Sequence, residues 1–143
     1  MKEIPKGKSR EDIKIREKII KDFYAKWISE HPDKKIWNKS LKDYIRVKFL
    51  SINETVGRAA GSPESTAAVL ELTSILSNAE YIVKKPRKEN DQNQKSFSHI
   101  IRMRYKKIRL IVGLQKSNGH YVQYCISSFS SVKKNKSRLG RDF

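Results

Sequence analysis

The sequence holds a single cysteine, so its fold is not built on disulfide bonds. Cys125 lies in an apolar run, and a lone thiol has no partner within the chain. Disulfides are rare in reducing compartments. Apolar runs long enough to span a bilayer are missing as well, and residues 1–6 lack the apolar stretch of a secretory signal. We therefore expect a soluble, cytoplasmic protein with no membrane partner.

Metal ligands and nucleotide-binding motifs are also scarce. The three histidines, His31, His99 and His120, lie far apart in the chain, and no carboxylate cluster accompanies them. The six glycines are scattered and form no phosphate-binding loop. The sequence thus predicts neither a metal site nor a nucleotide cofactor.

Acidic residues are few compared with basic ones. The 143 residues include 32 Lys or Arg against 15 Asp or Glu, which gives a formal net charge of +17. Such an excess attracts dense anionic surfaces, and nucleic acid is the commonest of these because binding releases its condensed counterions. An anionic membrane surface, an acidic protein partner and a merely Lys-rich solvated surface are the alternatives. Composition leaves RNA and DNA equally open.

Helical periodicity dominates the first half of the chain. Ser9 offers an N-cap for an amphipathic helix that ends near Glu30, and residues 1–8 before it are expected to be a flexible basic lead. The next elements are, in order, a short extended piece at 36–38 and helices at 40–45, 51–60 and 62–78.

The second half changes to the period of strands. Strands are predicted at 81–83, 97–105, 108–114 and 121–127, with a polar loop at 84–95. Asn118-Gly119 favours a tight hairpin before the last strand. Residues 130–143, rich in Ser, Lys and Arg, are predicted to be a disordered basic tail. This order predicts a single α+β domain over 9–129, with N-terminal helices packed on a C-terminal antiparallel β-meander of three to four strands.

Two arginines of the first long strand form a candidate phosphate site. Alternation puts Arg102 and Arg104 on one face, and Arg109 of the next strand is expected nearby. Guanidinium groups bind phosphates bidentately. A solvated outer face of the sheet is the alternative. Phe97 and His99 are predicted on the opposite face, where His99 is better interpreted as a core or edge histidine than as a catalytic base.

Aromatic residues of the last strand are candidates for base stacking. Tyr121 and Tyr124 stand among polar residues, and aromatic side chains on sheet surfaces stack the bases of single strands. Alternation places Gln123 and Ser127 on the side opposite Tyr124. Ordinary packing of these tyrosines is the alternative.

The chain resembles a known domain family over roughly residues 38–128. It is similar to the third class of large polyvalent protein-associated domains, which phages and conjugative elements carry, and to small proteins from mobile elements of gut Bacteroidetes. The segments that carry the resemblance are Asn38–Phe49, Ser51–Thr55, Ser65–Leu70, Ile75–Ala79, Val112-Gly113 and Tyr124–Ser127.

The order of helices and meander is also similar to that of the barnase/EndoU/colicin/RelE-like nucleases, which cleave RNA without a metal. This resemblance implies catalytic roles for Glu54 on a helix, for Arg102 or Arg104 on an early strand, and for Ser127 on a late one. The helix departs from the pattern because it has no histidine. By spacing alone, Glu54 and Arg58 are an ordinary i, i+4 surface pair.

Three functions are therefore open. The first is a nucleic-acid-binding accessory protein of a phage or conjugative element, the second is a metal-independent ribonuclease or toxin, and the third is a basic module for an acidic protein partner. The residues expected to bind nucleic acid are Arg58, Arg102, Arg104, Arg109, Tyr121 and Tyr124.

Overall fold

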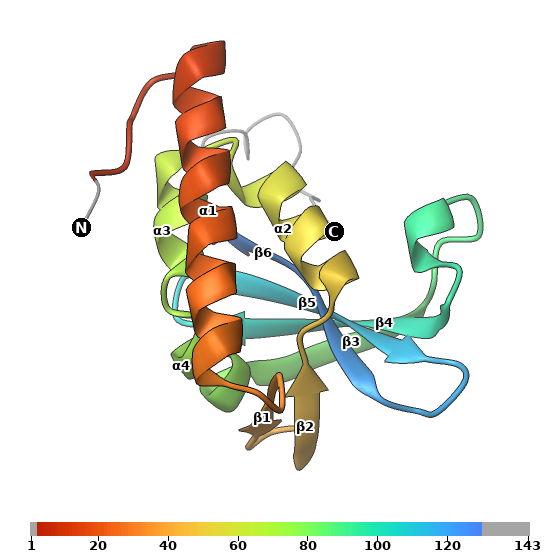
Figure 1. Ribbon diagram of the computed structural model, residues 1–143. Helices are drawn as coiled ribbons and strands as arrows, with labels where there is room; N and C mark the ends of the chain where they lie inside the picture. Colours follow the sequence, from red (N-terminus) through yellow and green to blue (C-terminus); the bar gives the residue numbers. More distant parts are fainter. Residues whose placement is uncertain (1–2, 130–143) are drawn as a thin grey trace.

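A six-stranded sheet carries its helices on one face in the computed structural model (Figure 1). The structure describes residues 3–129, so the predicted tail at 130–143 lies outside the described residues. Helices come mainly from the N-terminal half and the long strands from the C-terminal half. The predicted α+β class is confirmed.

The first helix, α1 (Arg10–Glu30), begins as the sequence predicts. The Ser9 hydroxyl accepts a hydrogen bond from the Asp12 backbone N–H at 3.1 Å, which satisfies one of the free donors at the helix start. Its buried residues are Arg16, Ile20, Tyr24 and Trp27. Apart from Arg16, these make the stripe that packs against the later helices of the chain.

The predicted helix that begins at Ser40 is wrong. The chain instead forms a hairpin of β1 (Lys35–Asn38) and β2 (Asp43–Arg46). The buried Asn38 side chain explains the turn: its oxygen accepts from the backbone N–H groups of Ser40 and Leu41, while its nitrogen donates to two backbone carbonyls at the end of the fourth helix. A tertiary contact thus overrides the local helical spacing.

Three short helices follow the hairpin. They are α2 (Phe49–Ala59), α3 (Pro63–Val69) and α4 (Leu72–Asn78). The sequence predicted the last two as one helix. The break at Leu70 and Glu71 turns the chain, and both halves bury apolar residues in the main core as a result.

The remaining strands form a four-stranded antiparallel meander. They are β3 (Glu80–Pro86), β4 (Phe97–Tyr105), β5 (Ile108–Gln115) and β6 (Tyr121–Ser128), with the 3-10 turn η1 (Gln92–Gln94) between β3 and β4. The sheet order is β1-β2-β6-β5-β4-β3, and β2 pairs with β6 in parallel. The meander is confirmed, and the N-terminal hairpin raises the strand count above the predicted three to four.

The sheet has an inner face under the four helices and an outer face that one side of α2 and the segment around η1 border. Ile101, Met103, Leu110 and Ile126 point inward into the main core. A second, smaller cluster lies on the outer face and contains Phe97, Val122, Tyr124 and Cys125.

A bulge in β4 overturns the predicted place of Phe97. The register shifts between Phe97 and His99. Phe97 therefore packs on the outer face, edge-on to Tyr124 with ring centroids 5.8 Å apart. Its ring lies over Gly113, where a Cβ would collide with it, so glycine is the residue that leaves room for this packing.

A second bulge, in β6, makes the predicted face of Ser127 wrong, while Gln123 lies opposite Tyr124 as predicted. Ile111 pairs with Cys125 and Val112 pairs with Gln123, so Tyr124 is the extra residue. Gln123 consequently points into the helix side and is fully buried. Cys125 and Ser127 point to the outer face, the side on which Tyr124 packs.

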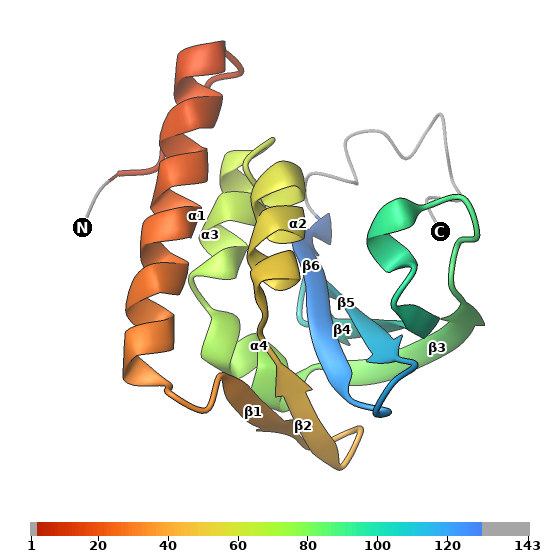
Figure 2. The same ribbon diagram turned by 45° about the vertical axis from the view of Figure 1, so that its right-hand side comes forward.

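Helix α2 lies beside β6 where the short β2 stops (Figure 2). A buried network holds it there. The Tyr24 hydroxyl donates to Oε1 of Gln123 at 2.7 Å, and Nε2 of Gln123 donates to the Thr55 hydroxyl at 2.7 Å. One amide therefore links α1, α2 and β6.

The start of the described chain is fastened to the helices. The fully buried Arg16 donates from one guanidinium nitrogen to the backbone oxygens of Pro5 and Gly7, and from Nε to that of Ala60 at 2.7 Å. Among residues 3–129, no helix is both long and apolar enough to cross a bilayer.

We expect Thr55→Val to lower the free energy of unfolding by about 1–3 kcal/mol, because it leaves the buried amide nitrogen of Gln123 without an acceptor. Thr55→Ser keeps the hydroxyl and should cost less. Chemical denaturation monitored by circular dichroism measures both. Equal stability of the valine variant and the original protein would contradict the role of this network.

Candidate nucleic-acid interface

A pocket of about 160 Å³ opens on the outer face of the sheet. Its floor is formed by β4, β5 and β6, and its walls by α2 and the segment around η1. Four cations line it: Arg58, Lys88, Arg102 and Arg109. We call this site the arginine pocket. Hydroxyl groups of Tyr124 and Ser127 and the Cys125 thiol lie among these cations.

Strand register places two of the arginines. Arg102 pairs with Ile111, which pairs with Cys125, and these three form one row across the outer face. Arg109 stands one row further, between Arg104 and Ser127. Neighbouring rows therefore place the guanidinium groups of Arg102 and Arg109 and the hydroxyl of Ser127 next to one another on the outer face.

Arg104 is turned away from the pocket. Its Nε donates to the backbone oxygen of Lys106 at 3.0 Å, and its guanidinium lies 5.2 Å from the ring centroid of Phe129. It is exposed and does not line the arginine pocket.

The wall helix α2 contributes charges of both signs. Arg58 lines the pocket, and Glu54 lies one turn earlier on the same side of the helix. Burial raises the pKa of the Tyr124 hydroxyl above its usual range, and the negative charges of Glu54 and Asp91 raise it further. Glu54 is thus close to Tyr124.

The Tyr124 hydroxyl is a buried polar group that faces the pocket. The side chain is 1% exposed. Within residues 3–129 no group meets full hydrogen-bond geometry with this hydroxyl, but the side chains of Gln94 and Glu54 lie close enough to interact with it. Like any tyrosine hydroxyl it is protonated near neutral pH, and it can donate a hydrogen bond to an anion in the pocket.

The pKa values of Cys125 and Arg102, two further residues of the pocket, are shifted by burial. Burial raises the pKa of the Cys125 thiol to about 11, while the nearby Arg58 and Arg109 oppose this rise and Glu54 adds to it. Partial burial lowers the pKa of the Arg102 guanidinium. Of the pocket cations, Arg102 and Arg109 are half-buried whereas Arg58 and Lys88 are exposed. A cation that is partly withdrawn from water binds an anion more strongly.

Most of the predicted site residues come together here. The pocket contains Arg58, Arg102, Arg109, Tyr124 and Ser127, with Glu54 beside it. Tyr121 lies elsewhere, because it packs against the main core beside Ile45. His99 also lies outside the pocket, and its Nδ1 is 3.0 Å from the Ser98 hydroxyl.

Lys88 and Gln94 are among the pocket residues that were not predicted from the sequence. They come from the segment predicted as a polar loop, which instead folds over the outer face (Figure 2). The Gln94 side-chain oxygen accepts from the Lys88 backbone N–H at 2.9 Å, and Asp91 caps η1. Periodicity carries no signal for such a fold.

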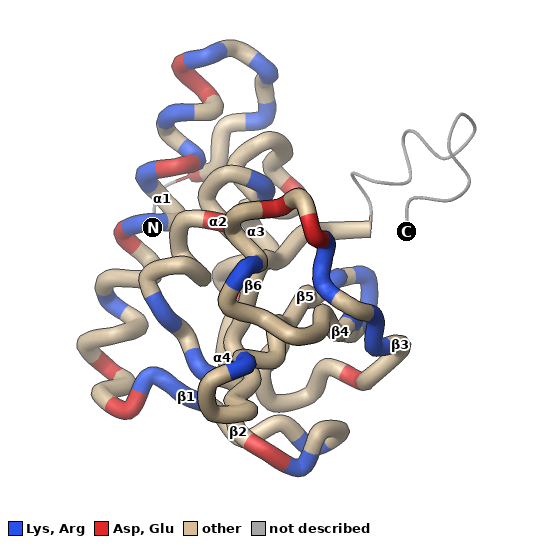
Figure 3. Tube along the Cα trace, turned by 90° about the vertical axis from the view of Figure 1, so that its right-hand side faces the viewer, with Lys and Arg blue, Asp and Glu red and all other residues tan. Residues whose placement is uncertain are grey.

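Positive charge is unevenly distributed over the described chain (Figure 3). Along α1, six Lys or Arg alternate with five Asp or Glu. Between residues 80 and 109, in contrast, ten Lys or Arg accompany three acidic residues. The strands and the loop that surround the pocket therefore hold more of the excess charge than the long helix does.

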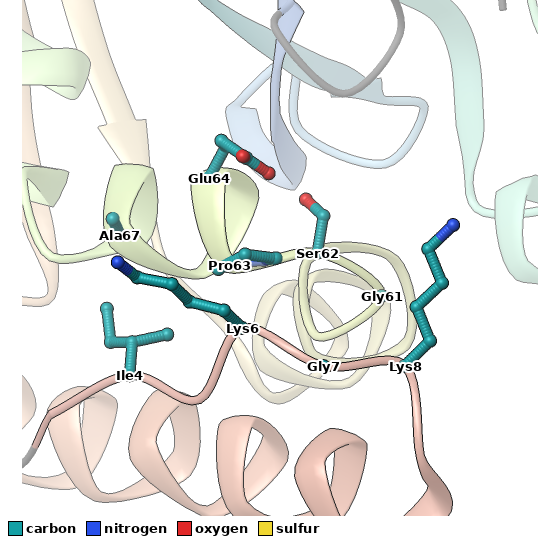
Figure 4. Close-up of a pocket in the computed structure, with 9 residues that line it drawn as sticks. All are labelled: Ile4, Lys6, Gly7, Lys8, Gly61, Ser62, Pro63, Glu64 and Ala67. Atoms are coloured by element: carbon teal, nitrogen blue, oxygen red, sulfur yellow. The ribbon is translucent and has the colours of Figure 1, made fainter. Parts of the chain in front are cut away.

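A roomier pocket of about 500 Å³ lies between the N-terminal segment and α3 (Figure 4). Lys6 and Lys8 border it from one side and Ser62 and Glu64 from the other. The Ser62 hydroxyl is engaged as the N-cap of α3, since it accepts from the Ser65 backbone N–H. We therefore assign the candidate site to the arginine pocket.

Comparison with known proteins gives one family match. The family model described as "Large polyvalent protein-associated domain 3" matches residues 15–121, which is well over half of the chain. No curated protein and no solved structure shows significant similarity to it.

We expect the Cys125 thiol to react slowly in the folded protein. With a pKa of about 11, about one thiol in a thousand is ionised at pH 8. A thiol-specific disulfide reagent at pH 8 should label the folded protein at least 100-fold more slowly than the unfolded chain, whose thiol ionises near pH 8.5. Because the pKa of the Cys125 thiol is higher in the folded state, the neutral thiol contributes to stability below about pH 8.5. This contribution is lost as the pH rises from about 8.5 to about 11.

Labelling of folded and unfolded protein at equal rates would contradict the burial of Cys125 in the pocket floor. A Cys125→Ser variant gives the background of the assay.

Proposed function

The chain belongs to the large polyvalent protein-associated domain 3 family, and we propose that it binds the phosphate backbone of nucleic acid in the arginine pocket. The observation that carries this proposal is the convergence of Arg58, Arg102 and Arg109 around the buried Tyr124 hydroxyl. Each of these groups donates hydrogen bonds. An anionic oxygen is the complementary partner.

The size of the pocket favours one phosphate group over a larger ligand. Its volume of about 160 Å³ is below the roughly 300–1,000 Å³ typical of pockets for whole small molecules. A phosphodiester has two non-bridging oxygens that share one negative charge, and these suit two guanidinium groups from adjacent strands. The rest of a polymer would then run along the surface outside the pocket.

The surrounding charge favours a polymer over a free anion. Lys84, Lys85, Arg87 and Lys106 lie on the segments next to the pocket. A chain of phosphates would release counterions at each of these contacts, whereas a single anion would not. An acidic protein offers fewer charges per unit length, and we treat it as an alternative outcome of the test.

We expect Arg102→Gln and Arg109→Gln each to weaken binding to oligonucleotides about 5- to 30-fold at low salt, as the loss of one charge-assisted contact of about 1–2 kcal/mol implies. Each should also reduce the slope of log affinity against log salt by about 1. Fluorescence anisotropy with labelled RNA and DNA, single- and double-stranded, at several salt concentrations measures both quantities.

Lys21→Gln on the exposed side of α1 is the matched control, since it removes one charge far from the pocket. If no polymer binds at low salt, or if the pocket variants match the control, nucleic-acid binding by the pocket is rejected. Binding to an acidic peptide in place of all four polymers would favour the third function.

A specific observation favours ribonuclease activity as a second candidate function. Glu54 lies beside Tyr124 at a pocket that also contains Arg58 and Ser127. In such a reaction the 2′-oxygen bonds to phosphorus and gives its proton to the Glu54 carboxylate. The bond to the 5′-oxygen breaks, and Tyr124 supplies the proton that this leaving oxygen takes up. The arginines would stabilise the charge on the phosphoryl oxygens.

If this second function holds, RNA incubated with the protein in EDTA is cleaved to fragments ending in 2′,3′-cyclic phosphate, and DNA of the same sequence stays intact. Glu54→Gln should lower the rate at least 100-fold while it binds RNA at least as well as the original protein. Gel electrophoresis and mass spectrometry identify the products. Intact RNA between pH 5 and 8 would reject the activity and leave the binding function standing.

The family membership suggests the cellular setting in which the protein acts. By its description the domain is associated with large polyvalent proteins, and we propose that this chain acts as an accessory protein of a phage or conjugative element. Binding to nucleic acid without sequence preference would suit such a role, because backbone contacts carry no sequence information.

A further inference from the structure

An exposed pair of aromatic rings stands on the β1–β2 hairpin. Trp37 is 49% exposed and Tyr44 is 37% exposed. Their ring centroids lie 5.3 Å apart in an edge-to-face arrangement. The ammonium group of Lys35 lies 4.4 Å from the centre of the Tyr44 ring. Large rings left open to water next to a cation are a feature of ligand-binding surfaces rather than of a core.

The fold does not need these rings for its own core. Ile36 and Ile45 are paired across the hairpin and point inward against the main core. Asn38 fastens the turn to α4. Because alternate residues of a strand point to opposite faces, Trp37 and Tyr44 are left on the outer face.

Strand register puts the aromatic pair on the same face as the arginine pocket. Arg46, two residues beyond Tyr44, pairs with Val122 of β6. Val122 packs in the outer cluster with Tyr124 and Cys125, two residues of the pocket floor. The outer face is therefore continuous from the hairpin to the pocket, over a distance on the order of 20 Å by strand spacing and rise.

The charge around the rings suits a polyanion. The segment from Lys34 to Lys48 contains six Lys or Arg and one Asp, a net charge of +5. An apolar protein surface would not match this excess. A strand of nucleotides matches both features, because it offers bases to the rings and phosphates to the cations.

We propose that Trp37 and Tyr44 stack bases of a single-stranded nucleic acid whose phosphates occupy the arginine pocket. The inference rests on the proposed binding function and restricts the ligand from nucleic acid in general to single strands. In a duplex the bases are stacked on one another and their faces are closed to these rings, whereas a single strand can present them. The distance from hairpin to pocket fits a site of several nucleotides.

The test compares Trp37→Ala with the original protein on single-stranded RNA, single-stranded DNA and duplexes of about 12 nucleotides, long enough for a site of this kind. We expect affinity for single strands to fall about 5- to 100-fold, as the loss of one stacked base predicts. The salt slope should stay unchanged because stacking releases no counterions. A difference between the RNA and DNA arms would identify the natural polymer.

Tyr81→Ala is the matched control. Tyr81 is 48% exposed, as Trp37 is, but it pairs with Met103 on the inner side of β3. Trp37→Phe keeps an aromatic ring and should retain most of the affinity. Thermal unfolding of each variant checks that the hairpin still folds.

Intrinsic fluorescence gives a second readout. Trp27 is 3% exposed, so quenching on addition of an unlabelled single strand should come from Trp37 and should vanish in Trp37→Phe. Unchanged single-strand affinity of Trp37→Ala, with a normal response of the arginine variants, would overturn the stacking site alone. Absence of binding to every polymer would instead reject the proposed function itself.

Discussion

The buried amide of Gln123 is the contact on which the rest of the structure depends. It accepts from the Tyr24 hydroxyl and donates to that of Thr55, so a single side chain joins the long helix, the wall helix and the last strand. Each partner is buried, and a polar group left unsatisfied there would cost about 1–3 kcal/mol. Helix α2 is therefore held at one position along β6. The geometry of the arginine pocket follows from that position.

The pocket forms because α2 and β6 each place some side chains in the core and others on the outer face of the sheet. Along α2, Thr55 and Val56 face the core while Glu54 and Arg58 face outward, as the helical period allows. Along β6, the bulge at Tyr124 lets Gln123 point inward and still brings Cys125 to the outer face. Without the extra residue, strict alternation would place Gln123 and Cys125 on the same side. The same two adjacent elements, α2 and β6, thus form both the core packing and the arginine pocket.

Charge and exposed rings give the outer face its chemical character. Two half-buried cations, Arg102 and Arg109, and two exposed ones, Arg58 and Lys88, line a pocket of phosphate size. An aromatic pair set among further cations stands on the same face. The long helix, with acids and bases in almost equal number, lacks this bias. A net charge alone would attract any polyanion. The spacing of pocket and rings is what favours a flexible single strand.

The sequence by itself determined the class of fold, the first helix, the four-stranded meander and the family, since these depend on periodicity, on capping and on residues close together in the chain. It also singled out Arg58, Arg102 and Arg109, because charged residues on regular elements are visible from spacing. Only the tertiary structure decided that Ser40 lies in a turn, that Phe97 and Ser127 change faces, and that Lys88 and Gln94 complete the pocket. The bulges, the Asn38 turn and the folded loop depend on contacts with residues far along the chain. A local sequence pattern does not predict such contacts.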